Sequence, residues 1–125
     1  MALILVAEDD GDLRQLLADM IESRGHQVAT AADGVKMIEQ ARDLRPSLIV
    51  ADLMMPGAYG SAAAKALQQD PATASIPIIF LTAVAPAQAE KVVPKAPHVR
   101  LMHKPMDMPA LFAAIAELLA SPGGT

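Results

Sequence analysis

Reactive side chains follow four of the five short apolar runs in this sequence. In chain order they are Glu8-Asp9-Asp10, Asp52, Thr82 and Lys104. Apolar runs of this kind are typical of buried strands in a parallel sheet, and ligands bind such sheets at the edge where the carboxyl ends of the strands meet. The spacing therefore predicts one crevice that contains carboxylates, a hydroxyl and an ammonium group.

The acidic residues of this crevice point to a divalent cation. Carboxylates placed close together repel one another unless some are protonated or a cation binds between them. The available ligands are oxygen atoms and the chain has no cysteine. We therefore expect Mg²⁺, with Mn²⁺ as the alternative.

A cation beside Asp52 would allow its carboxylate to attack a phosphoryl group and form an aspartyl phosphate. Thr82 could donate a hydrogen bond to one phosphoryl oxygen, and Lys104 could pair with another. The small Ala83 leaves room for the phosphoryl group beside its backbone N–H. The pattern thus predicts in-line phosphoryl transfer that depends on positioning and electrostatics.

Each of these residues also has an ordinary structural explanation. Acidic residues at the start of a helix often only cap it, and we expect this of Asp10. A lone Thr82 would be a strand residue, and a lone Lys104 would be a surface charge. Asp52 has little structural reason to end an apolar strand, so its occurrence with the others favours the chemical explanation.

Alternating strands and helices must position these side chains. The apolar runs are 3–7, 28–31, 48–51, 76–81 and 99–102. Helical patterns lie between the runs. The first ends near Gly25 and places five apolar residues on one face: Leu13, Leu16, Leu17, Met20 and Ile21. The other helical patterns cover 33–44, 61–69, 87–93 and the segment after Asp107. This order indicates a doubly wound α/β fold. We expect one domain over residues 1–120 and a flexible tail over 121–125.

The composition excludes several classes of protein. The 125 residues contain no cysteine, which excludes a disulfide scaffold, a zinc ribbon and thiol catalysis. A net charge of −4 with no tryptophan argues against direct binding of nucleic acid. No basic segment precedes the first apolar run, so we expect neither a signal peptide nor a membrane span. We expect a cytoplasmic location. The histidines, which we expect at the surface, are His26, His98 and His103.

Four motifs together resemble the receiver domains of response regulators in bacterial two-component systems. They are Leu5-Val6-Ala7-Glu8-Asp9-Asp10 with Arg14, Asp52-Leu53-Met54-Met55-Pro56 with Gly60, Thr82-Ala83, and Lys104-Pro105. The resemblance covers the whole chain. It implies a flavodoxin-like (CheY-like) fold, in which five parallel strands have the order 2-1-3-4-5.

The resemblance also implies roles for individual residues. Asp52 is identified as the phosphoacceptor, and the Thr82 hydroxyl and Lys104 as parts of the family's switch. The implied metal ligands are Asp9, Asp52, the backbone carbonyl of Met54 and, through water, Glu8. The backbone of Ala83 would bind the phosphoryl group. The implied phosphodonor is a sensor histidine kinase or a histidine phosphotransfer protein, and the signal would pass to a downstream protein or an output domain. Such a protein signals and is not classed as an enzyme.

Two departures from the family lie near the fifth predicted strand. Leu101 stands where receivers usually carry an aromatic residue, and Pro86, Pro94 and Pro97 interrupt the region of the usual fourth helix. They leave a phosphate-independent pseudo-receiver as an alternative. A second alternative is a small Mg²⁺-dependent phosphohydrolase, but these enzymes commonly carry a second carboxylate where this chain has Met54.

We expect slow self-dephosphorylation, because Met54 and Val84 flank the route of the attacking water in the family and neither can orient water by hydrogen bonding. Met54→Asn should therefore shorten the lifetime of the phosphorylated protein. The decay of the phosphoryl adduct, followed by intact mass after removal of the phosphodonor, measures this lifetime. An unchanged lifetime in the variant would show that the explanation is wrong.

Overall fold

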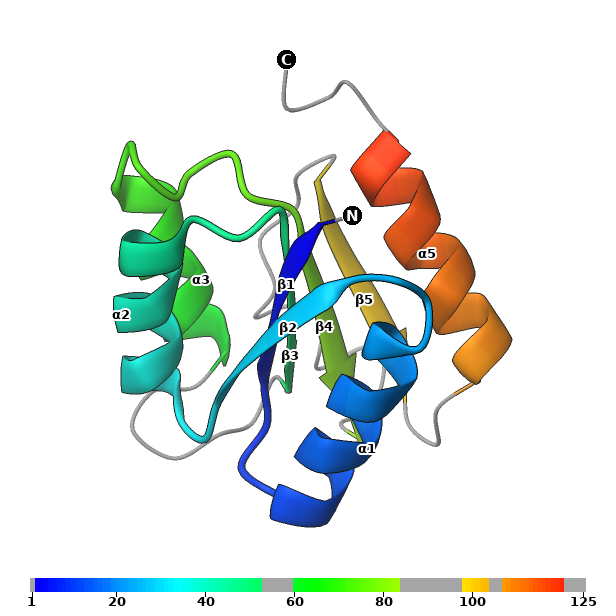
Figure 1. Ribbon diagram of the computed structural model, residues 1–125. Coiled ribbons are helices and arrows are strands. Elements are labelled where there is room, and N and C mark those ends of the chain that lie inside the picture. The colour runs from blue at the N-terminus through cyan, green and yellow to red at the C-terminus, as the bar shows by residue number, and fades with distance from the viewer. Residues whose placement is uncertain (1, 53–59, 84–97, 104–106, 121–125) are drawn as a thin grey trace.

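The computed structural model describes residues 2–52, 60–83, 98–103 and 107–120. Within these ranges, five strands form one parallel sheet in the order β2-β1-β3-β4-β5 (Figure 1). The strands are β1 (Leu3–Ala7), β2 (Gln27–Ala31), β3 (Leu48–Asp52), β4 (Ile78–Thr82) and β5 (Val99–His103). The helices are α1 (Gly11–Glu22), α2 (Gly34–Leu44), α3 (Gly60–Gln69) and α5 (Met108–Ala120). The predicted α/β class and strand order are confirmed.

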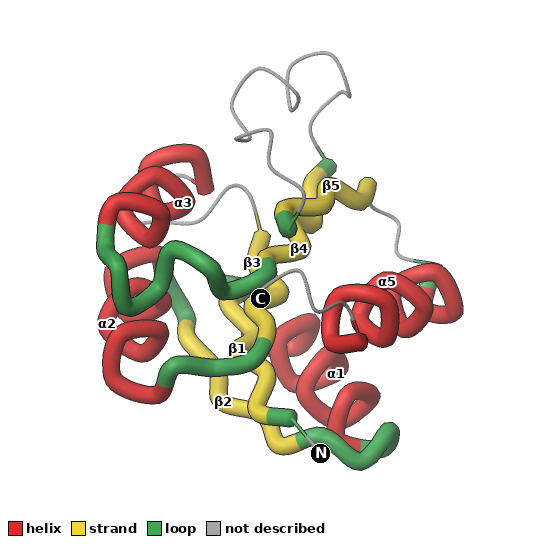
Figure 2. Tube along the Cα trace, turned by 90° about the horizontal axis from the view of Figure 1, so that it is seen from above, coloured by secondary structure: helices red, strands yellow, loops and turns green. Residues whose placement is uncertain are grey.

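Helices cover both faces of the sheet. Seen from above, α2 and α3 lie on one side, and α1 and α5 lie on the other (Figure 2). Successive residues of a strand point to opposite faces, so each apolar run supplies two cores. Leu5 and Phe80 belong to the core under α2 and α3, whereas Val6 and Ile79 belong to the core under α1 and α5. Burial on both faces explains why β1, β3 and β4 are almost continuously apolar.

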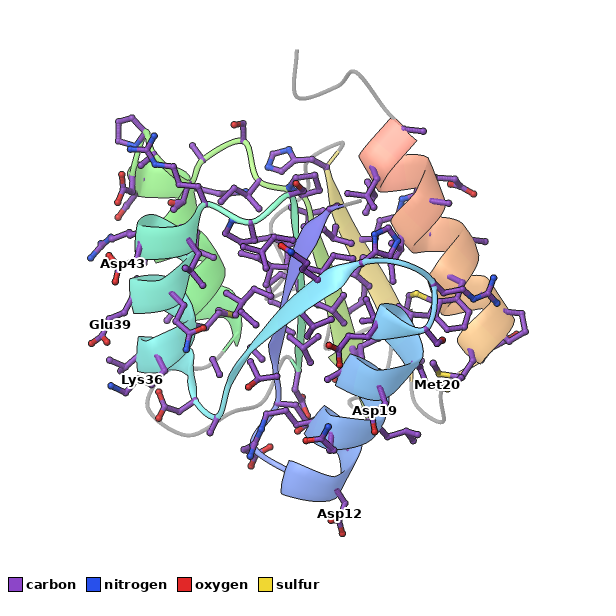
Figure 3. All side chains as sticks on the ribbon, viewed as in Figure 1. Asp12, Asp19, Met20, Lys36, Glu39 and Asp43 are labelled. Atoms are coloured by element: carbon purple, nitrogen blue, oxygen red, sulfur yellow. The ribbon has the colours of Figure 1, made fainter. Side chains whose placement is uncertain are left out.

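The solvent-facing sides of the helices carry charged residues. Lys36, Glu39 and Asp43 project outward from α2, and Asp12 and Asp19 project from α1 (Figure 3). The Nζ atom of Lys36 lies 3.6 Å from a carboxylate oxygen of Glu39, with both side chains exposed. Exposed pairs of this kind contribute little to stability. These charges instead decide which face of each helix turns toward water.

The predicted helix ends are confirmed. The carboxylates of Asp10, Asp33 and Asp107 accept hydrogen bonds from backbone N–H groups two or three residues further on, at distances from 2.8 to 3.2 Å. These bonds satisfy donors that have no partner inside the helix. After α1, Gly25 adopts a φ of 92°, which a residue with a side chain rarely adopts.

Strand boundaries differ from the prediction by one or two residues. Four strands extend one residue beyond the predicted run: β2 begins at Gln27, and β3, β4 and β5 end at Asp52, Thr82 and His103. β4 begins at Ile78 rather than at residue 76, because the Ile76 N–H donates to the Thr73 carbonyl in a turn and Pro77 has no N–H for the sheet.

Burial of individual side chains also departs from the periodic pattern. Leu16 is 54% exposed, so the apolar face of α1 is narrower than predicted and centres on Leu17 and Ile21. His103 is exposed as predicted, but His26 and His98 are only partly exposed, and each has a buried ring nitrogen. Both of these histidines directly precede a strand, where neighbouring elements partly cover them.

Two predicted features lie outside the described residues: the short helix at 87–93 and the tail at 121–125. Among the helices that the structure describes, none combines the length and the apolar character that crossing a bilayer requires.

An ion pair joins α2 to the loop after α3. The Nε atom of Arg42 lies 2.8 Å from one carboxylate oxygen of Asp70, and the other oxygen accepts a hydrogen bond from the Ala72 N–H at 2.9 Å. The bond from the Ala72 N–H and the nearby Arg42 guanidinium hold the pKa of Asp70 below its usual value. The carboxylate thus stabilises the packing of two helices on one face of the sheet.

We expect Asp70→Asn to lower the free energy of unfolding at neutral pH. Because the pKa of Asp70 is lower in the folded chain than in the unfolded chain, the carboxylate stabilises the fold above its unfolded-state pKa. That contribution is lost as the pH falls through the folded-state pKa. Urea unfolding of wild type and variant should therefore converge in acid, with Asp43→Asn as the control for loss of a surface charge. A difference of equal size at neutral and acid pH would contradict this explanation.

Candidate functional site

Three carboxylates meet at the carboxyl edge of the sheet. Oxygen atoms of Glu8, Asp9 and Asp52 lie within 4.8 Å of one another. The meeting follows from the pairing of β1 with β3, in which Ala7 lies opposite Ala51 and the next residues along each strand are therefore neighbours. The prediction that these side chains converge is confirmed.

The three carboxylates differ in burial. Glu8 is 1% exposed and Asp52 is 8% exposed, whereas Asp9 is open to solvent. Removing charged groups from water is costly unless a counter-charge or hydrogen bonds compensate them. The site therefore combines two buried acids with a third acid at its mouth, an arrangement that an incoming hydrated cation can reach.

Hydrogen bonds hold the acidic loop between β1 and α1 in place. The Glu8 N–H donates to the Ala31 carbonyl at 3.0 Å, and a Glu8 carboxylate oxygen accepts from the Asp10 N–H at 3.1 Å. Arg14, in the first turn of α1, donates from its guanidinium to the Glu8 carbonyl at 2.8 Å. The backbone on both sides of Asp9 is thereby fixed.

The contact made by Arg14 was not predicted. The sequence singles out Arg14 only as part of a motif, because its reach back to residue 8 depends on the turn between β1 and α1. The Asp10 carboxylate instead accepts from the N–H groups at the start of α1, at 3.0 and 3.2 Å. The interpretation of Asp10 as a helix cap is confirmed.

The predicted hydroxyl lies on the neighbouring strand. Thr82 ends β4 and is fully buried. Asp52 pairs with Leu81, so Thr82 stands one position beyond the end of β3. Ala83, which follows Thr82, is exposed. A hydroxyl and a small residue thus lie beside the strand that carries Asp52.

Two predicted site residues lie outside the described residues. Lys104 directly follows His103, which pairs with Thr82 across β4 and β5. Met54 follows Asp52 by two positions. Their predicted roles stay predictions.

The donor set of the described cluster suits a hard divalent cation. All three groups offer carboxylate oxygens, the ligands that Mg²⁺ prefers, and none offers sulfur or imidazole. Glu8, Asp9 and Asp52 would hold such an ion, and its charge would relieve their mutual repulsion. The same charge would allow an anionic phosphoryl group to approach the Asp52 carboxylate.

Comparison with known proteins gives the family context. The family model described as response regulator receiver domain matches residues 4–116. Protein PilH of Pseudomonas aeruginosa is 34% identical over 121 residues, which cover 96% of this chain and 99% of PilH. The DNA-binding regulator RpaA of Synechocystis is 33% identical, but the match covers only 49% of its length.

Solved structures agree with this context. A putative response regulator from Chloroflexus aurantiacus has a TM-score of 0.88 at 26% identity, over 96% of this chain and 98% of the other. The receiver domain of a sensor histidine kinase from Pseudomonas aeruginosa has a TM-score of 0.88 at 25% identity, with the same coverage. In that second structure a magnesium ion is coordinated in the active-site cleft.

We expect Asp9→Asn to weaken Mg²⁺ binding by about tenfold or more, because an amide replaces a charged ligand at the open side of the site. Isothermal titration of the protein with MgCl₂ measures this change. Asp12→Asn removes an exposed acid from the first turn of α1 and serves as the matched control. Equal affinity in the two variants would show that Asp9 is not a ligand.

Proposed function

The chain belongs to the response regulator receiver family, and from this membership we propose that Asp52 accepts a phosphoryl group in a reaction that requires a divalent cation. The chain is a receiver domain of two-component phosphorelay signalling. The observation that carries the proposal is the meeting of Glu8, Asp9 and Asp52 at the carboxyl edge of the sheet. Mg²⁺ is the proposed ion, and Mn²⁺ has the same ligand preferences.

The proposed reaction is a transfer between two side chains. An oxygen of the Asp52 carboxylate forms a bond to the phosphorus of a phosphohistidine while the P–N bond breaks. The bonding electron pair leaves with the imidazole nitrogen, which takes up a proton. A cation bound by Glu8, Asp9 and Asp52 would supply the positive charge that offsets repulsion between the carboxylate and the phosphoryl oxygens.

Residues of the neighbouring strands would hold the transferred group. We propose that the Thr82 hydroxyl and the Ala83 backbone N–H donate hydrogen bonds to phosphoryl oxygens, and that Lys104 pairs with a third. The backbone carbonyl of Met54 is proposed as a further metal ligand. The burial of Thr82 and its position beside β3 support its part in this arrangement.

Two alternatives are less well supported. A phosphate-independent pseudo-receiver would not require three carboxylates that meet at one edge of the sheet, with Asp9 open to solvent. A phosphohydrolase of this kind commonly carries a second carboxylate two residues after its nucleophile, and residue 54 is methionine. The acidic cluster therefore favours the receiver reaction over both alternatives.

The proposed partners are a sensor histidine kinase or a histidine phosphotransfer protein as donor, and a downstream protein or an output domain as target. The match covers 99% of PilH but only 49% of RpaA, so the chain spans nearly all of one relative and about half of the other. Residues 1–120 are proposed as the receiver unit, with 121–125 as its tail. A cytoplasmic location is proposed because kinase donors of this class draw on ATP.

Incubation with acetyl phosphate should give a single phosphoryl adduct on the wild-type chain, detected by intact mass. The adduct should require Mg²⁺, disappear in EDTA and be absent from Asp52→Asn. Asp43→Asn, which removes an exposed acid from α2, is the matched control and should be phosphorylated normally. An adduct that persists in folded Asp52→Asn would place the phosphoryl group elsewhere and overturn the proposal.

A further inference from the structure

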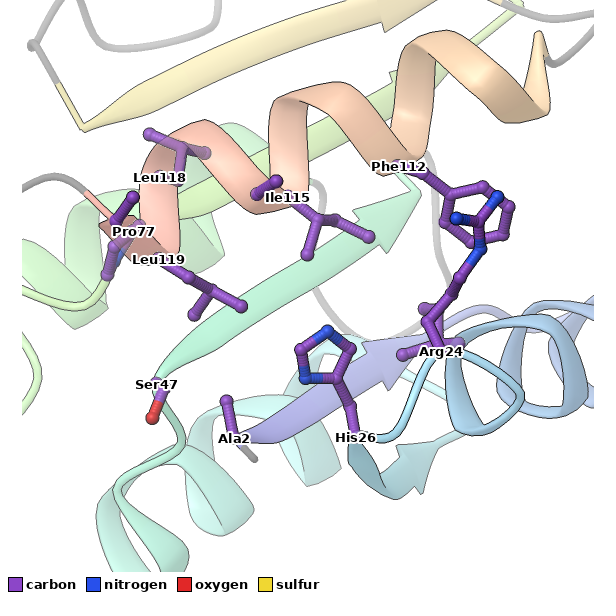
Figure 4. A pocket seen from close by; sticks show the side chains of 12 residues that line it. Ala2, Arg24, His26, Ser47, Pro77, Phe112, Ile115, Leu118 and Leu119 are labelled. Atoms are coloured by element: carbon purple, nitrogen blue, oxygen red, sulfur yellow. The ribbon is translucent and has the colours of Figure 1, made fainter.

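A cavity lies at the end of the sheet opposite the acidic cluster. It has a volume of about 730 Å³. Four of its lining residues, Ala2, His26, Ser47 and Pro77, come directly before β1, β2, β3 and β4. Helix α5 runs along its other side (Figure 4). Because parallel strands have separate amino and carboxyl ends, this cavity is distinct from the proposed phosphorylation site.

Most of the cavity wall is apolar. Helix α5 contributes Phe112, Ile115, Leu118 and Leu119, and α1 contributes Ile21. Pockets for small organic ligands usually have volumes of about 300–1,000 Å³ and walls of this kind, with only a few polar groups. The size and the lining therefore fit a ligand with a substantial apolar body.

The ionisable residues of the lining are basic. They are Arg24 and His26, and no described residue of the lining is acidic, although the chain contains 14 acidic residues. Arg24 lies at one end of the cavity, with its guanidinium carbon 4.1 Å from the centroid of the Phe112 ring (Figure 4). Such stacking uses the face of the guanidinium and leaves its N–H groups at the edge available to an anion.

The ring of His26 rises from the start of β2 into the space between the sheet and α5 (Figure 4). Its Nδ1 atom is buried and has no hydrogen-bond partner within the described part of the chain. Because this atom is closed to solvent, a ligand in the cavity would instead meet the rest of the His26 ring, which lines the cavity together with Arg24. His26 is thus the second basic side chain of the lining.

We propose that this cavity binds an apolar monocarboxylate, with the carboxylate beside Arg24 and His26 and the hydrocarbon body against α5. The basic lining favours a negative charge over a positive one, and the apolar wall favours a hydrocarbon over a small inorganic anion. Binding needs no phosphorylation of Asp52, since the two sites lie at opposite ends of the strands.

Decanoate is the probe, and decanol and decylammonium of equal chain length are the comparison ligands. Titrated into ¹⁵N-labelled protein, decanoate should shift the amide signals of residues 24–26 and of the second half of α5. Decanol should bind about tenfold more weakly, because it lacks the charge-assisted hydrogen bonds. Equal affinity for decanoate and decanol, or decanoate shifts confined to other surfaces, would overturn the proposal.

Matched variants separate the carboxylate contacts from general damage to the fold. Arg24→Gln and His26→Phe should each weaken decanoate binding by about tenfold and leave decanol binding unchanged. Arg42→Gln, which removes an equal charge from the opposite face of the sheet, should bind decanoate as wild type does. Intact phosphorylation by acetyl phosphate in each variant verifies the fold. The proposal is wrong if Arg24→Gln binds decanoate as tightly as Arg42→Gln does. It is also wrong if the same amides shift with protein concentration alone, because a second copy of the chain would then cover the cavity.

Discussion

Repulsion among three carboxylates at one edge of the sheet is the constraint that the surrounding structure must withstand. Two full charges at the 4.8 Å that bounds the oxygen atoms of Glu8, Asp9 and Asp52 would repel by about 3 kcal/mol at an effective dielectric constant of about 20. A divalent cation bound between these oxygen atoms would offset that repulsion, and an anionic phosphoryl group could then approach Asp52.

The elements around the cluster are built to resist this repulsion. β1 and β3 are paired along their length and buried on both faces, so their ends cannot separate without breaking the sheet and exposing both cores. Arg14 and the Ala31 carbonyl hold the backbone of Glu8, and Asp10 ties the acidic loop to the start of α1. The apolar cores thus contribute to the site, because the packing of β1 and β3 keeps the three carboxylates in fixed positions.

Parallel strands also give the sheet two chemically different ends. At one end of the sheet, acidic residues meet at the carboxyl ends of β1 and β3. At the other end, the residues that precede the strands line a basic and apolar cavity together with Arg24, which lies in the turn after α1. Helix α5 packs along the sheet and contributes Ile115 and Leu118 both to the core and to the cavity wall. A chain with a net charge of −4 therefore presents a surface whose charge is unevenly distributed.

Local signals in the sequence predicted the α/β class and the meeting of Glu8 and Asp9 with Asp52. These signals are the apolar runs of strand length, the acids that follow them and the helix caps. The strand order came from the family resemblance. The strand ends shifted only where a backbone detail intervened, as at Pro77, whose missing N–H delays the start of β4. The exposure of Leu16, the contact from Arg14 to the Glu8 carbonyl and the burial of the His26 ring nitrogen could not be predicted. Each depends on how far one element lies from another. Periodicity gives the direction of a side chain around its own helix or strand, but only the packed tertiary structure decides what stands opposite it.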